Sequence, residues 1–196
     1  MTEQSSPSVY EQAVTTDRPA EMLAKKHGFE SVAHLAQSLP KDAQILDIGA
    51  GASPFGKEVA TLRPDITWVN FDYSYQDPAI LGDVSKDAPA NVKYVPGDAT
   101  KLVDVYEPES FDAVFSYWLL PHLSIDNLGP AKAVARAVFA VTKPGGLMSV
   151  GPKASHSKLP SLKSGKAIQV IKDESLDANR YAERIVNETK LPKTAR

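Results

Sequence analysis

Apolar residues follow two different spacings along this chain. Short, nearly continuous apolar runs are typical of buried strands, and apolar residues that recur every three or four positions are typical of helices. The first pattern predicts strands over residues 44–48, 66–71, 92–95, 111–116, 147–150 and 167–171. The second predicts helices over residues 54–62, 126–142 and 176–191, and one or two short helices, broken at Gly28, within 19–39. We expect residues 73–91 to form a loop with one helical turn.

The alternation of strands and helices predicts an α/β fold in which a mostly parallel sheet is covered on both faces. The expected architecture is a three-layer αβα sandwich over residues 43–196, with residues 1–42 packing on it as an N-terminal helical cap. Right-handed crossovers place the loops that follow the strands at one common edge. Residues 47–51, Asp72, Asp98 and residues 116–122 are therefore expected to lie close together.

The chain after residue 150 offers only one further strand and one helix. We therefore expect a shortened or rearranged C-terminal edge of the sheet. An uncovered edge strand pairs readily with another copy. The sequence thus predicts a homodimer through this edge.

Composition narrows the classes of partner. A chain of 196 residues, 42% of them hydrophobic, is long enough for one domain with a sizeable core. A net charge of −2 gives no reason to expect nucleic acid or acidic membranes as partners. The sequence has no cysteine, which excludes disulfides and Cys-ligated metals, and we predict no metal site.

The expected location is the cytoplasm. Residues 1–7 lack the basic and then apolar pattern of a signal peptide. The longest conspicuous apolar run, residues 113–125, is interrupted by Pro121 and His122. It is also shorter than the roughly 20 residues that cross a membrane as a helix.

The most informative segment is the turn over residues 45–56, Ile-Leu-Asp-Ile-Gly-Ala-Gly-Ala-Ser-Pro-Phe-Gly. A strand ends beyond Asp47, and Gly49 and Gly51 allow the backbone to approach a ligand closely. Ser53 suits the cap of the next helix and Pro54 its first position. A strand, a glycine turn and a helix N-terminus together predict a nucleotide or nucleoside cofactor at the carboxyl edge of the sheet.

Two common cofactor motifs fit this turn badly. The dinucleotide fingerprint requires a third glycine where this chain has Pro54. The phosphate-binding G-x-x-x-x-G-K-[ST] motif does not occur. A nicotinamide-dependent oxidoreductase is therefore disfavoured.

Five segments in order carry a resemblance to a known family. They are Leu-Asp-Ile-Gly-Ala-Gly-Ala-Ser from Leu46, Val-Asn-Phe-Asp ending at Asp72, Gly97-Asp98-Ala99, residues 111–122 (Phe-Asp-Ala-Val-Phe-Ser-Tyr-Trp-Leu-Leu-Pro-His), and Lys143-Pro144-Gly145-Gly146. This set resembles the class I S-adenosylmethionine-dependent methyltransferases of the small-molecule type, which have a Rossmann-like fold. The resemblance covers residues 43–151 and implies S-adenosylmethionine as the cofactor.

The resemblance also implies which residues hold this cofactor. Backbone groups near the glycines approach the methionine part, Asp72 accepts from the ribose hydroxyls, and Asp98 and Ala99 meet the adenine. Ser116 and Tyr117 lie under the sulfonium. The complete expected set is Asp47, Gly49, Ala50, Gly51, Asp72, Tyr73, Asp98, Ala99, Ser116 and Tyr117.

Several of these assignments have a plain structural alternative. Asp47 either contacts the ligand or only caps and orients the turn. Asp98 follows Pro-Gly and could serve only as a turn residue. Tyr73 and Tyr75 either flank the adenine or pack as loop aromatics.

Methyl transfer is an in-line displacement at an activated carbon, so placing the acceptor and excluding water supply much of the catalysis. If the acceptor must lose a proton, His122 is the candidate general base. The alternative is that His122 hydrogen-bonds near the cofactor or caps a helix. Tyr10, Tyr117 and Trp118 are candidates to shape the acceptor pocket.

The sequence lacks an Asp/Asn-Pro-Pro-aromatic segment after the fourth strand, which in the resembling family accompanies methylation of amino groups of bases and glutamine. The expected function is therefore methyl transfer to an unidentified small molecule. The alternative is a non-catalytic S-adenosylmethionine-binding regulatory or interaction protein with the same fold.

Overall fold

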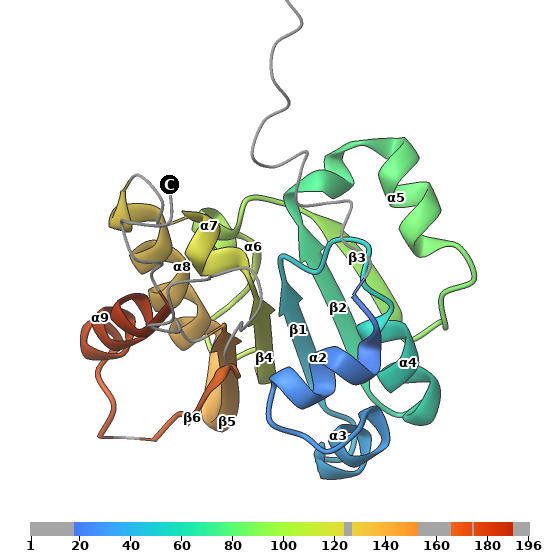
Figure 1. Ribbon diagram of the computed structural model, residues 1–196, viewed down its shortest axis with the longest axis horizontal. Helices are drawn as coiled ribbons and strands as arrows, with labels where there is room; N and C mark the ends of the chain where they lie inside the picture. The colour runs from blue at the N-terminus through green and yellow to red at the C-terminus, as the bar shows by residue number, and fades with distance from the viewer. Residues whose placement is uncertain (1–17, 124–126, 153–165, 174, 190–196) are drawn as a thin grey trace, which may run out of the picture.

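A single six-stranded sheet organises the protein. The computed structural model describes residues 18–123, 127–152, 166–173 and 175–189. The strand order is β3-β2-β1-β4-β5-β6, and the strands lie side by side in this order in Figure 1. The neighbours are parallel except β6, which runs antiparallel to β5. The strands are β1 (Gln44–Ile48), β2 (Thr67–Asp72), β3 (Val92–Pro96), β4 (Phe111–Tyr117), β5 (Thr142–Gly151) and β6 (Ile168–Ile171).

Helices cover both faces of this sheet (Figure 1). On one face lie α2 (Ala20–Lys26), α3 (Val32–Ser38) and α4 (Phe55–Leu62). On the other lie α6 (Leu102–Val105), α8 (Leu128–Val141) and α9 (Ala178–Thr189). The remaining helices, at or beyond the carboxyl ends of the strands, are η1 (Tyr73–Gln76), α5 (Pro78–Ser85), η2 (Ala99–Lys101) and α7 (Leu119–Leu123). The predicted Rossmann-like αβα sandwich is confirmed.

Strand β4 shows how the sequence separates the two halves of the core. Successive side chains of a strand point to opposite faces of the sheet. Phe115 and Tyr117 accordingly pack with α2 and α4, whereas Val114 packs with α8 and α9. These strand residues are almost fully buried, as expected for a parallel sheet that is covered on both sides.

Most predicted strands agree with the structure within about two residues. Strand β5 is the exception, because it begins at Thr142 rather than Leu147. Thr142 pairs with Phe111, and the pairing then shifts before Ala113 pairs with Leu147. The turn-like Lys-Pro-Gly-Gly segment therefore lies within the strand as an irregularity.

The loop expected over residues 73–91 contains a full helix, α5. None of its residues is fully buried, and its apolar residues Ile80, Leu81 and Val84 span little more than one turn, which is too short a stretch to reveal a helix by periodicity. The sequence feature that indicates this helix is its N-terminal cap. The N–H of Ala79 donates to Oδ1 of Asp77 (2.8 Å), and Pro78 occupies the first turn, where no N–H is required.

The C-terminal edge is short in the part of the chain that the structure describes. One antiparallel strand, β6, follows β5, and helix α9 packs on α8 through Tyr181, Ile185 and Val186. This agrees with the expected shortened edge. The boundary at residue 42 between a helical cap and the domain stays a prediction, since α2 and α3 share one core with the sheet.

Two helical glycines predict opposite effects of the same substitution. Alanine is the better helix former by up to about 1 kcal/mol. At Gly56, however, a Cβ would overlap the indole of Trp68, which is fully buried and donates to Oδ1 of Asn70 (3.1 Å). We expect Gly56→Ala to lower the free energy of unfolding by about 1–3 kcal/mol through overpacking.

Gly82→Ala is the matched control, because nothing lies within 4 Å of a Cβ at that position in α5. It is expected to raise the free energy of unfolding by about 0.5–1 kcal/mol. Urea denaturation followed by circular dichroism measures both variants. A stabilised Gly56→Ala variant would show that Trp68 can move aside.

Candidate active site

A cavity of about 690 Å³ opens at the carboxyl edge of the sheet. The strand order reverses between β1 and β4, and ligands of open α/β sheets bind at such a switch point. The cavity walls include residues that directly follow β1, β2, β3 and β4. Its volume is in the range that holds a drug-sized ligand. Convergence of these loops, predicted from the sequence, is what creates the cavity.

Ten of the eleven predicted site residues line this cavity. They are Asp47, Gly49, Ala50, Gly51, Asp72, Tyr73, Asp98, Ala99, Tyr117 and His122. Ser116 is absent from the lining. It is fully buried, and its Oγ has no hydrogen-bond partner in the described structure. Its place between Phe115 and Tyr117 on β4 turns it to the opposite face.

The glycine turn is held open toward the cavity. Gly49 and Gly51 have φ angles of 73° and 54°, a region that side chains other than glycine rarely adopt. The N–H of Gly49 donates to the carbonyl of Phe71 (2.8 Å). A Cβ at Gly51 would meet nothing within 4 Å, so the backbone there faces empty space. This is a cradle in which a ligand can contact the main chain.

Asp72 at the end of β2 connects this turn to the next loop. Its Oδ2 accepts from the N–H of Gly51 (2.9 Å), and its Oδ1 accepts from the N–H (2.8 Å) and hydroxyl (2.6 Å) of Ser74. A carboxylate has about four acceptor positions, so one remains on Oδ2. For Asp72 to accept hydrogen bonds from two ligand hydroxyls, the Ser74 hydroxyl would have to turn away from Oδ1.

Asp98 caps a turn and also lies in the cavity wall. Its Oδ1 accepts from the N–H (2.9 Å) and hydroxyl (2.8 Å) of Thr100, which makes it the cap of η2. Both bonds use Oδ1, and Asp98 also lines the cavity. Its Oδ2 is therefore the atom that can accept from a ligand amino group.

The two loop tyrosines differ in role. Tyr75 is buried, donates its hydroxyl to the carbonyl of Gly51 (2.7 Å) and packs edge-on against Tyr94. It supports the glycine turn and does not line the cavity. Tyr73 lines the cavity and is 48% exposed, so only this ring is available to flank a ligand.

The carboxyl group of Asp47 lies at the floor of the cavity and is almost completely buried. Burial and, to a smaller extent, the nearby Asp72 carboxylate together raise its pKa to about 8, and Arg18 opposes the shift. A protonated Asp47 is therefore the main form of the free protein at neutral pH. A cation bound beside it would favour the ionised form.

Arg18 is a site residue that sequence reasoning missed. Its Nη1 donates to the carbonyl of Tyr117 (3.2 Å), and its own carbonyl accepts from the hydroxyl of Ser53 (3.2 Å). Arg18 thus connects the glycine turn to the end of β4 along the cavity wall. It lies before the first regular element of the described residues, so no periodicity or motif marks it. Tyr10, also considered for the acceptor pocket, lies outside the described residues.

His27 was missed for a different reason. It occupies an apolar position of the predicted N-terminal helix and looks like a core residue. Burial lowers its pKa to about 3, Ser149 Oγ lies 2.8 Å from its Nδ1, and its ring stacks on Phe55. The neutral imidazole nevertheless forms part of the cavity wall beside Tyr117.

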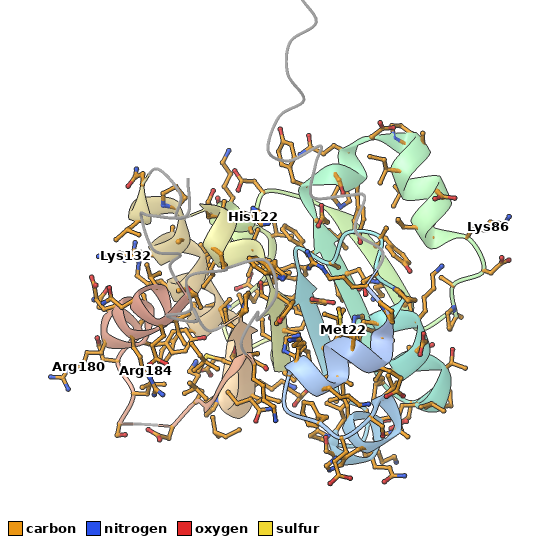
Figure 2. The ribbon with its side chains drawn as sticks, in the orientation of Figure 1. Met22, Lys86, His122, Lys132, Arg180 and Arg184 are labelled. Atoms are coloured by element: carbon orange, nitrogen blue, oxygen red, sulfur yellow. The ribbon has the colours of Figure 1, made fainter. Side chains whose placement is uncertain are left out.

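The cavity ends at α7, where Figure 2 shows His122 above the central strands. The imidazole of His122 is exposed, and partial desolvation together with the Arg18 charge lowers its pKa. A neutral imidazole at neutral pH is the form that accepts a proton. Trp118 lies between His122 and Tyr117. In the described ranges, no group of three His, Asp or Glu side chains is placed to hold a metal ion.

The donor and acceptor set fits S-adenosylmethionine. The open backbone at Gly51 and the carboxyl of Asp47 suit the methionine part with its ammonium and sulfonium groups. Asp72 offers an acceptor to ribose hydroxyls, and Asp98 offers one to the adenine amino group. Ala99 starts η2 beside Asp98. The same wall would also accept other nucleosides, so the family comparison is needed to choose.

Among solved structures, a Bacillus halodurans protein described as a candidate methyltransferase has a TM-score of 0.50 and 21% identity, over 64% of this chain and 52% of that one. The cyclase SpnF has a TM-score of 0.51 and 21% identity, over 77% of this chain and 54% of that one. At this identity, both show a shared fold. The chain spans about half the length of each of these structures.

The sequence comparison is more specific. No curated protein sequence matches the chain significantly. Residues 45–146, however, match the sequence family described as a methyltransferase domain, and they include all five segments from the glycine turn to Gly146. This match covers more than half of the chain. The protein therefore belongs to the methyltransferase domain family, and its cofactor is S-adenosylmethionine.

Proposed function

We propose that the protein transfers the methyl group of S-adenosylmethionine to a small-molecule acceptor. One observation carries this proposal. The cavity of about 690 Å³ is continuous from the cofactor edge at Asp72 and Asp98 to the aromatic end at Trp118 and His122. A cofactor seated at the first end would direct its methyl group toward the second. The remaining space suits a small acceptor.

The cofactor would be held by groups from four loops. The backbone at Gly49–Gly51 and the carboxyl of Asp47 would hold the methionine part. Asp72 would accept from the ribose, and Asp98, Ala99 and Tyr73 would meet the adenine. Tyr117 would lie near the sulfonium. Ser116, which faces the opposite side of the sheet, has no part in this arrangement.

The chemistry demands little of the protein beyond placement. The sulfonium activates its own methyl group, so holding the acceptor in line and excluding water supplies most of the catalysis. A hydroxyl acceptor must also lose a proton. His122 is placed at the acceptor end and has a lowered pKa, which suits it to take this proton.

Several wider expectations accompany this proposal. The net charge of −2 supports a small-molecule rather than a nucleic acid acceptor. Among the described helices, none has the length and apolar character needed to span a bilayer. A cytoplasmic location and a homodimer through the C-terminal edge of the sheet stay predictions. The edge strand β6 has only four residues, and so short an edge offers little backbone for pairing with a second copy.

The binding test of this proposal is Asp72→Ala. Losing acceptors for the ribose hydroxyls is expected to weaken S-adenosylmethionine binding about 10- to 100-fold, since hydrogen bonds to a charged group contribute about 1.5–3 kcal/mol. Isothermal titration calorimetry with S-adenosylmethionine and S-adenosylhomocysteine measures the affinity. NAD, titrated as a control, should give no heat.

Ser74→Ala is the matched control, because it removes a hydroxyl that bonds Oδ1 of Asp72 and leaves the carboxylate in place. Its affinity should remain within about threefold of the wild type. Unchanged affinity in Asp72→Ala would remove Asp72 from the site. No heat with either sulfur compound would refute the proposed function.

An acceptor screen with methyl-labelled cofactor separates the enzyme from a non-catalytic binder. Because SpnF, whose name describes a cyclase, shares the fold, the fold alone does not decide this point. Label transfer to a small molecule is the expected result. Tight cofactor binding without transfer would favour a regulatory or interaction protein.

A further inference from the structure

We propose that the acceptor is a small aromatic compound with a ring hydroxyl and a negative or neutral substituent, held against Trp118 and His122. This inference rests on the proposed function, because it concerns the acceptor end of the same cavity. The lining there includes Arg18, Tyr117, Trp118 and His122.

The first observation is the backbone of Trp118. Its φ angle is 74°, in the left-handed region that bulky residues rarely adopt. The N–H of Trp118 donates to the carbonyl of Gly151 (2.7 Å), which fixes this conformation at the end of β4. Strained residues that persist in this way cluster at ligand sites. Here the strain holds a half-buried indole that packs on the core and forms part of the cavity wall.

The second observation is the arrangement of rings around this indole. The His122 ring lies 6.0 Å from the Trp118 ring at 44°, and the Tyr117 ring lies 6.4 Å away at 87°. Leu119, Leu123 and Pro130 complete an apolar boundary. Aromatic rings attract one another in offset-stacked and edge-to-face geometries. The acceptor end therefore favours a flat aromatic ring over a flexible aliphatic chain.

The third observation is the sign of the local charge. The Arg18 guanidinium lies close enough to His122 and Asp47 to lower the pKa of both groups. A cationic acceptor would meet this charge and the sulfonium together. A phenol or a hydroxybenzoate avoids this repulsion, and a carboxylate substituent is attracted by Arg18. Amine acceptors are correspondingly disfavoured.

In the proposed methyl transfer, the ring hydroxyl of the acceptor is the nucleophile. Its oxygen attacks the methyl carbon, forming a C–O bond as the S–CH₃ bond breaks. The electron pair of the broken bond stays on sulfur, which becomes a neutral thioether. The hydroxyl proton passes to the neutral imidazole of His122, which is exposed and returns it to solvent.

The sequence offers a direct binding readout. The chain has two tryptophans, and Trp68 is fully buried beneath α4, so a ligand at the acceptor end acts on the fluorescence of Trp118. With S-adenosylhomocysteine present, salicylate or protocatechuate is expected to quench this fluorescence saturably. Cyclohexanecarboxylate has the same charge without an aromatic ring, and tyramine has the phenol with a positive charge. Both controls should bind at least about tenfold more weakly.

The activity test uses the same probes with methyl-labelled S-adenosylmethionine. Label should appear on a hydroxyl oxygen of salicylate or protocatechuate. Trp118→Leu should raise KM for this acceptor at least about tenfold with little change in the Kd for S-adenosylmethionine, and Trp118→Phe should restore much of the loss. A merely structural role of Trp118 would change both constants together and would overturn the assignment.

The outcomes separate this inference from the proposed function. Label transfer to putrescine, with no response to either hydroxybenzoate, overturns the aromatic acceptor and leaves the methyltransferase proposal standing. Cofactor binding with neither saturable quenching nor transfer to these probes also overturns the aromatic acceptor. Failure to bind S-adenosylmethionine overturns the proposed function itself.

Discussion

Gly51→Leu is expected to weaken S-adenosylmethionine binding by at least about 100-fold. A side chain at this position points into open space, because a Cβ would meet nothing within 4 Å. In the proposed complex, that space belongs to the methionine part of the cofactor. Leucine would fill it and block the approach of the ligand to the backbone. Calorimetric titration of the folded variant measures the loss.

Gly145→Leu is the control that separates steric blocking of the cofactor from the effect of backbone strain. Gly145 also has a left-handed backbone, with φ of 76°, and nothing lies within 4 Å of a Cβ there. It is exposed in β5 and does not line the cavity. Both substitutions should cost about 1–2 kcal/mol of stability through the left-handed conformation. Only Gly51→Leu should lose cofactor affinity, and equal affinities of the two variants would show that Gly51 does not contact the cofactor.

Much of the fold was predictable because its strands are buried on both sides. Residues 44–48 are apolar at three of five positions and residues 111–116 at four of six, and this pattern identified the strands that flank the switch point. Asp72 and Asp98 then followed from their places at strand ends. Residues that follow parallel strands meet at one edge of the sheet because of the topology, and the local sequence pattern is enough to show where each strand ends.

The errors have equally specific physical causes. Helix α5 has no fully buried residue and only a short set of apolar ones, so apolar spacing gave a weak signal, although the Asp77-Pro78 cap could have revealed the helix. Ser116 was assigned to the site although strand alternation turns it away from Tyr117. Arg18 donates to the carbonyl of Tyr117 at the end of β4, and the two residues are 99 positions apart in the chain. Contacts of that kind depend on tertiary packing and leave no local pattern.

Asp47→Asn is expected to make the free protein more stable at pH 8 and a weaker binder of its cofactor. Because the pKa of Asp47 in the folded protein is about 8, the folded protein keeps a proton that the unfolded chain releases near the ordinary aspartate pKa of 3.8. The folded state therefore binds more protons between these values, and stability falls as the pH rises through this window. From pH 5 to pH 8 this group costs the wild type on the order of 3 kcal/mol.

Asparagine does not ionise, so the variant should escape this loss. Urea denaturation at pH 5 and pH 8 measures the difference between the two proteins. Asp173→Asn is the control with the opposite sign, because hydrogen bonds from Ser175 lower the pKa of Asp173. Its contribution to stability is lost only as the pH falls, and it should not alter the slope between pH 5 and pH 8. Parallel curves for wild type and Asp47→Asn would show that Asp47 is ionised in the free protein.

Cofactor binding should reverse the protonation of Asp47. The ammonium and sulfonium groups of S-adenosylmethionine favour the carboxylate, so the wild type should release a proton on binding at pH 7. Calorimetry in buffers with different ionisation enthalpies detects this release. Asp47→Asn should bind without proton release and at least about tenfold more weakly, since one unit of pKa corresponds to about 1.4 kcal/mol. Stability gained and affinity lost in the same variant would identify Asp47 as a group strained for its ligand rather than a cap of the turn.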